Sequence, residues 1–145
     1  MSPDHAISIL LVDGDDNSRT YFAERLRQRS PDYFIFEAAS AKAGLQIYES
    51  ISIDCVVLEL DLPDTSGFEL LVELVPIASR PEVAVVVLTR LTSSSLLNIA
   101  LKNGAQAVSQ KSMTSCDSLD KAILKAISTV TAEKGKHTRR SDPLG

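Results

Sequence analysis

The fold of this chain is decided by the stretch Cys55-Val56-Val57-Leu58-Glu59-Leu60-Asp61-Leu62-Pro63-Asp64-Thr65-Ser66-Gly67. Its opening apolar run is typical of a strand that is buried on both faces of a parallel sheet. The Pro, Asp, Ser and Gly residues that follow are turn formers. Beyond the turn, residues recur at the spacing of one helical face, at Gly67, Leu70, Leu71 and Leu74. The stretch therefore predicts a strand over 55–60, a loop, and an amphipathic helix that ends near Pro76.

The same strand-then-helix pattern continues on both sides of this stretch. Apolar, aromatic or β-branched runs predict strands over 7–12, 33–38, 83–88 and 105–109. Helical stripes and stop signals predict helices over 17–28, 41–51, 93–103 and 119–130, the first capped by Asn17 or Ser18. Parallel strands joined by helical crossovers form a sheet with helices on both faces. We expect an α/β fold of the flavodoxin-like doubly wound type, with five parallel strands in the order 2-1-3-4-5.

Length and charge limit the domain count and the partners. With 145 residues, of which 44% are hydrophobic, the chain suits one domain with its own core. Residues 134–145 carry a net charge of +3, which leaves −7 on residues 1–133 from a total of −4. An acidic body repels nucleic-acid phosphates. Residues 131–145 lack an apolar stripe, so we expect a domain over 1–130 and a flexible tail or linker over 131–145.

The cysteines and the N-terminus indicate the compartment. Cys55 lies in an apolar run and Cys116 in a Ser/Thr-rich turn, with no His or third Cys nearby, which predicts free thiols and no zinc site. No apolar stretch is long enough to span a bilayer. The N-terminus also lacks the pattern of a signal peptide. We therefore expect a cytoplasmic protein that has neither a membrane nor a nucleic acid as its partner.

Polar residues stand at or just after the ends of four predicted strands: Asp13, Glu59, Thr89 and Lys111. The carboxyl ends of parallel strands meet at one edge of a doubly wound sheet, and ligands bind in the crevice there. Each residue alone has an ordinary structural explanation as a turn or solvated residue. Together they predict one shared site.

Over residues 7–130 the chain resembles the receiver domains of response regulators, the CheY-like family. The resemblance rests on Ile9-Leu10-Leu11-Val12-Asp13, Leu62-Pro63-Asp64 with Gly67, Leu88-Thr89, Asn103-Gly104-Ala105 and Gln110-Lys111, in this order and at these spacings. It implies that Glu59 occupies the phosphoacceptor position. It also implies that Asp13 belongs to an acidic pocket, with Asp15 or Asp16 as the candidate second acid, and that Thr89 and Lys111 are switch residues.

The chain departs from the family pattern at five positions. Gly14 stands where the family has its second acid, and Glu59 stands where it has the acceptor aspartate. Arg90 replaces a small residue, Val108 replaces an aromatic residue, and Ser112 replaces a proline. Mg²⁺ requires near-octahedral oxygen ligands, and phosphoryl transfer depends on it. Gly14 removes one carboxylate and Glu59 displaces another by a methylene. We expect no metal site, or a weak Mg²⁺ site at Asp13, Glu59 and Asp61.

Two interpretations of Glu59 follow. In the preferred one, Glu59 pairs permanently with Lys111 and holds the domain in one signalling state without phosphate. In the other, the site has decayed and Glu59 is solvated.

The first functional hypothesis is an atypical, non-enzymatic receiver that acts through protein contacts, without phosphorylation and without a cofactor. The second is a receiver that accepts a phosphoryl group from a histidine kinase with Mg²⁺. A flavin carrier is a third, which the acids of 13–17 disfavour because they would repel phosphate.

The expected partner is a protein or the chain's own output domain. The resemblance places the contact, including a homodimer contact, on the face formed by 93–103, 105–109 and 119–130. Ser141-Asp142-Pro143-Leu144 weakly resembles the start of diguanylate cyclase domains. This suggests a receiver that regulates a C-terminal output domain of that kind.

Overall fold

The computed structural model describes residues 6–141. Its single parallel sheet has the order β2-β1-β3-β4-β5. The strands are β1 (Ile7–Val12), β2 (Tyr33–Ala38), β3 (Cys55–Leu58), β4 (Ala84–Thr89) and β5 (Ala107–Gln110). The helices are α1 (Asp16–Arg29), α2 (Ala41–Ser50), α3 (Gly67–Leu74), α4 (Ser94–Lys102) and α5 (Cys116–Ser141), with a 3-10 turn, η2, over Lys111–Met113. The predicted fold class and strand order are confirmed.

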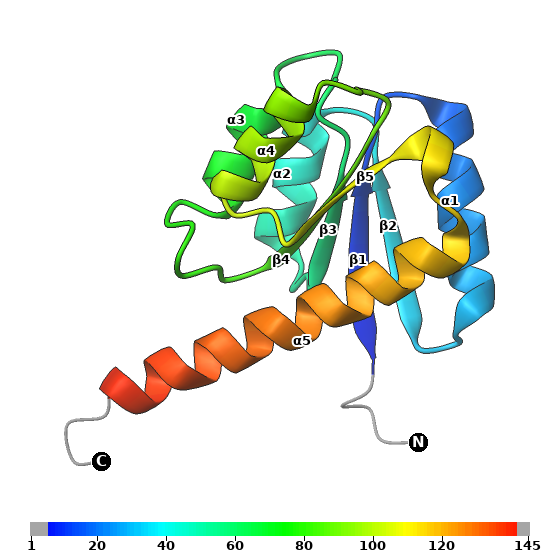
Figure 1. Ribbon diagram of the computed structural model, residues 1–145. Helices are drawn as coiled ribbons and strands as arrows, with labels where there is room; N and C mark the ends of the chain where they lie inside the picture. The colour runs from blue at the N-terminus through cyan, green and yellow to red at the C-terminus, as the bar shows by residue number, and fades with distance from the viewer. Residues whose placement is uncertain (1–5, 142–145) are drawn as a thin grey trace.

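Helices cover both faces of the sheet, α1 and α5 one face, and α2, α3 and α4 the other (Figure 1). Successive β1 side chains point to opposite faces, because the side-chain period of a strand is two. Leu10 and Val12 therefore join the core under α2–α4, while Ile9 and Leu11 join the core under α1 and α5. The sheet is thus buried on both sides, as its continuous apolar strands predict.

The first helix begins earlier than predicted. Its N-cap is Asp15, whose carboxylate accepts hydrogen bonds from the backbone N–H groups of Asn17 and Ser18. The prediction of Asn17 or Ser18 as the cap was wrong, because the Asp15 carboxylate, two residues before Asn17, already accepts from the free N–H groups of the first turn. The α4 stop is as predicted: Gly104 follows the Asn103 C-cap with a φ of 105°.

Helix α5 continues past the predicted end at residue 130 to Ser141. Val130 is buried, and farther along the Lys134 ammonium donates to the Glu82 carbonyl at 3.1 Å. No proline interrupts this stretch, so the helix continues. The flexibility of the tail stays a prediction, and residues 142–145 lie outside the described part of the chain.

Two smaller predictions can be compared with the described residues. Cys55 is buried, Cys116 is half-buried, and both are free thiols, as predicted. None of the helices within residues 6–141 has the length and apolar character needed to cross a membrane.

Gly67 allows α3 to start directly against the end of β3. A Cβ atom at this position would lie 2.5 Å from the Glu59 carbonyl oxygen and 2.6 Å from the Leu60 Cα. The Gly67 N–H donates to the Leu60 carbonyl at 2.8 Å. Because both obstructing atoms belong to the backbone, a side chain here would displace the segment that carries Glu59.

We expect Gly67→Ala to lower the free energy of unfolding by about 2–3 kcal/mol, the cost of forcing a methyl group into a packed site. Gly135→Ala is the matched control, because no atom lies within 4 Å of a Cβ built there. Within a helix this second change should stabilise by about 0.5–1 kcal/mol. Urea denaturation of the two variants measures both effects, and a Gly67→Ala variant as stable as wild type would contradict the packing argument.

Candidate functional site

The structure brings together the four residues predicted at the strand ends. Asp13 follows β1, Glu59 follows β3, Thr89 ends β4 and Lys111 follows β5. The three from the central strands are buried, with exposed fractions of 7% for Asp13, 2% for Glu59 and 0% for Thr89. Asp13, Glu59 and Lys111 border an open pocket of about 430 Å³, whose other lining residues are Gly14, Asp15, Asp61, Leu62, Pro63 and Arg90.

Parallel pairing extends past the strands and positions the two acids. The Asp13 N–H donates to the Ala38 carbonyl at 3.0 Å, and the Glu59 N–H donates to the Val12 carbonyl at 2.9 Å. Both backbones are therefore tied to a neighbouring strand, so the two side chains start from adjacent points at the sheet edge.

The Glu59 carboxylate is held by four donors. Oε2 accepts from the Thr89 hydroxyl and from the Asp61 backbone N–H at 3.2 Å. Oε1 accepts from the Arg90 backbone N–H at 3.1 Å and lies 3.0 Å from the Lys111 Nζ atom. A buried carboxylate requires such partners. The structure thus contains the predicted Glu59–Lys111 ion pair and does not fit a solvated Glu59.

Lys111 bridges the two buried acids. Its Nζ atom lies 2.7 Å from Asp13 Oδ2 and 3.0 Å from Glu59 Oε1. Burial pulls the pKa of Lys111 down, but hydrogen bonds and charge attraction from Asp13 and Glu59 outweigh it and raise that pKa. The ammonium group is therefore a fixed positive charge between two negative ones.

The candidates for a replacement second acid have other partners. Asp15 lines the pocket, but its Oδ1 atom caps α1, and its backbone N–H donates to Asp13 Oδ1 at 2.9 Å. Asp16 is exposed and pairs with Arg19 at 2.7 Å. The Arg19 guanidinium also donates to the Asp13 carbonyl at 2.6 Å. Asp15 therefore borders the site as predicted, whereas Asp16 pairs outside it.

Sequence reasoning missed the pairing of Asp61 with Arg90. The Arg90 Nε atom donates to Asp61 Oδ2 at 2.8 Å, and the same oxygen accepts from Nη2. From the sequence, Asp61 is only a candidate ligand of a weak Mg²⁺ site, and Arg90 is only a departure from the small residue of the family. Their position just after β3 and β4, which are neighbours in the sheet, was the signal that could have identified the pair.

The place of the missing acid at Gly14 is partly filled. A Cβ atom at Gly14 would lie 2.8 Å from Pro63 Cδ and 3.4 Å from the Ala39 carbonyl oxygen. The distance to Pro63 Cδ is much shorter than an ordinary contact, whereas the distance to the Ala39 oxygen is an ordinary one. A proline ring cannot rotate away. The loop that follows β3 therefore packs over Gly14 where a longer side chain would begin.

These residues do not fit a Mg²⁺ ion, which needs several free oxygen ligands in octahedral geometry. The carboxylates of Asp13 and Glu59 face the Lys111 ammonium, and Asp61 faces Arg90. Among the described residues, no cluster of three or more His, Cys, Asp or Glu side chains is placed to hold a metal ion.

Comparison with known proteins gives a consistent result. The sequence pattern of the family described as "Response regulator receiver domain" matches residues 9–124. A CheY-like receiver domain from Methanospirillum hungatei JF-1 superposes with a TM-score of 0.75 at 24% identity, covering 88% of this chain and 98% of that one. A receiver domain from Clostridium thermocellum gives a TM-score of 0.76 at 26% identity, with coverages of 87% and 98%.

A sequence relative is the "Two-component response regulator-like APRR5" of Arabidopsis thaliana. It is 35% identical over 74 residues, which are 48% of this chain and 12% of that protein. The match thus spans only a small part of the relative's length.

Proposed function

This chain belongs to the response regulator receiver domain family, and from this premise we propose that it is an atypical receiver of two-component signalling that acts through protein contacts without being phosphorylated. One observation carries the proposal. The carboxylate at the acceptor position, Glu59, has both oxygens engaged by hydrogen-bond donors or by Lys111.

An acceptor carboxylate must approach a phosphorus atom with a free oxygen, in line with the leaving group. Each Glu59 oxygen is instead engaged twice in a buried setting. The residues around it also do not fit the Mg²⁺ ion that would neutralise charge during transfer. Both points favour a receiver without phosphorylation over the alternative of a phosphoacceptor.

The same contacts support a fixed signalling state. Glu59 accepts from the Thr89 hydroxyl, and that hydroxyl oxygen accepts from the Leu91 N–H at 3.1 Å. The start of the β4–α4 connection is therefore tied to the end of β3. Val108, where the family usually has an aromatic switch residue, packs against the core on the α4 side. The position of α4 thus depends on Glu59, which is always present, in place of a phosphoryl group.

We propose that the permanently presented surface is the face of α4, β5 and α5. Apolar side chains are exposed on these two helices at Leu96, Ile99, Leu101 and Leu124. The partner there would be another protein, the chain's own output domain or a second copy. The diguanylate cyclase alternative rests on residues 141–144, of which 142–144 lie outside the described part of the chain.

The proposal also covers the compartment, the cofactor and the class of partner. We propose a non-enzymatic cytoplasmic protein without a resident cofactor, and with at most weak Mg²⁺ binding. The net charge of −7 on residues 1–133 favours neither nucleic acid nor an anionic membrane surface as the partner.

Backbone amide NMR tests the fixed state. Adding a small phosphodonor and Mg²⁺ to wild-type protein should leave the amide resonances of 89–110 unchanged. Glu59→Ala should shift them without any phosphodonor, because it frees Thr89 and the Arg90 N–H. Phosphodonor-induced shifts across α4 and β5 in the wild type would show instead that the state is switched by phosphorylation.

A further inference from the structure

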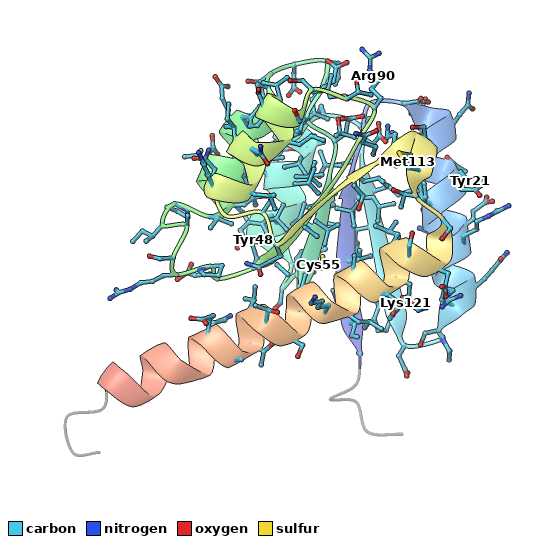
Figure 2. The ribbon with its side chains drawn as sticks, in the orientation of Figure 1. Tyr21, Tyr48, Cys55, Arg90, Met113 and Lys121 are labelled. Atoms are coloured by element: carbon cyan, nitrogen blue, oxygen red, sulfur yellow. The ribbon has the colours of Figure 1, made fainter. Side chains whose placement is uncertain are left out.

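The ion pair of Arg90 and Asp61 lies across the mouth of the Glu59 pocket. Both side chains line that pocket, and both also reach solvent, with exposed fractions of 71% for Arg90 and 42% for Asp61. Figure 2 shows Arg90 beyond the carboxyl ends of the strands, at the outer edge of the molecule. The guanidinium donates twice to one oxygen of Asp61. The pair therefore joins the loop after β4 to the loop after β3 on the solvent side.

The same two residues also hold Glu59 from the inside. The Arg90 backbone N–H donates to Oε1 at 3.1 Å, and the Asp61 backbone N–H donates to Oε2 at 3.2 Å. In each residue, the backbone N–H donates to the buried Glu59 carboxylate, while the side chain pairs with the side chain of the other residue. Separating the two side chains would let the two loops move apart and lengthen both backbone hydrogen bonds.

We propose that Arg90 and Asp61 form a clasp that sets how often Glu59 is released from its backbone donors. The clasp acts on the Glu59 site, and its role in signalling rests on the proposed function. Its effect on the backbone hydrogen bonds to Glu59 does not depend on whether the domain signals without phosphorylation. Arg90 and Asp61 are positioning residues, since their side chains act through the loops that carry their N–H groups.

The expected strength of the clasp follows from its exposure. Solvent-exposed ion pairs contribute little, and their contribution is screened by salt. The clasp should therefore reduce the opening of the site by about two- to fivefold. It should also weaken as the salt concentration rises, so that ionic strength tunes the release of Glu59.

Amide hydrogen exchange measured across the pair tests the clasp. In Asp61→Asn, exchange is read at the Arg90 N–H, and in Arg90→Ala it is read at the Asp61 N–H. Neither substitution changes the local sequence around the amide that reports on it. We expect each reporter to exchange about two- to fivefold faster than in wild type. High salt should accelerate both amides in wild type and have little effect in the variants.

Arg80→Ala is the control, because Arg80 is an exposed arginine in the loop before β4. The Val87 N–H in the middle of β4 reports on global unfolding. Acceleration confined to the reporters supports the clasp. Unchanged exchange at Arg90 in Asp61→Asn, or equal acceleration at Val87, would overturn it. Neither outcome depends on phosphorylation or on a partner, so the clasp can fail while the proposed function stands, and the reverse also holds.

Discussion

Wild-type protein treated with a small phosphodonor and Mg²⁺ is expected to show no phosphoryl adduct by intact-mass spectrometry. Two defects act together. Gly14 supplies no carboxylate for the metal, and the Glu59 carboxylate is held by its donors, one methylene farther out than an aspartate would be. Without the metal, the charge that develops during transfer is not neutralised.

Restoring the family residue at only one of the two positions should recover little phosphorylation. Glu59→Asp shortens the acceptor side chain but leaves the metal one carboxylate short, and Gly14→Asp adds that carboxylate but leaves the acceptor displaced. Only the double variant should recover a measurable Mg²⁺-dependent adduct, a non-additive result typical of residues that act as a unit. The four proteins are compared with and without a chelator, which serves as the control.

Packing around Gly14 is a third obstacle to phosphorylation. A side chain at Gly14 begins 2.8 Å from Pro63 Cδ, so the loop after β3 must shift to accept an aspartate there. We expect Pro63→Ala, added to the double variant, to increase its phosphorylation further. A Mg²⁺-dependent adduct on the wild type, mapped to Glu59 or Asp61, would establish the phosphoacceptor alternative in place of the proposed function.

Lys111→Met should lower the free energy of unfolding by about 3 kcal/mol, the usual cost of breaking a buried ion pair by removing one partner. The substitution leaves Asp13 and Glu59 facing each other across the space of the lost ammonium group, both of them buried. Lys121→Met is the matched control, because its side chain is 75% exposed and it pairs with Asp117 only on the surface of α5. That change should cost less than about 1 kcal/mol. Equal losses in the two variants, measured by urea denaturation, would contradict a stabilising role for the buried bridge.

The stability gap between wild type and Lys111→Met should also depend on pH. The folded-state pKa of Lys111 is raised, so its contribution is fully present below the unfolded lysine pKa of about 10.4. It is lost as the pH rises through the higher folded pKa, because deprotonation removes the charge that bridges the acids. The gap should therefore hold from neutral pH up to the usual lysine pKa and close above it. A gap that closes on moving only slightly above neutral pH would disagree with a raised pKa.

Local patterns in the sequence determined the fold and the membership of the site. The apolar runs around Ile9, Val56 and Val85 are short and rich in β-branched residues, which favours buried strands over helices, and the helical stripes between them predict crossovers. Once the strands are parallel, their carboxyl ends lie at one edge. Asp13, Glu59, Thr89 and Lys111 had to meet there, whatever their function.

Apart from the predicted Glu59–Lys111 pair, only the tertiary structure decided how the charges at that edge are paired. Asp15 caps α1, Asp61 pairs with Arg90, and Pro63 packs over Gly14. Each of these contacts depends on where a loop lies to within about an ångström, and loop positions are set by packing across the whole sheet and not by local propensity. The sequence by itself determined which groups would gather at the site. Packing decided that Lys111 binds both buried acids, because side-chain hydrogen bonds depend on distances that a sequence pattern does not specify.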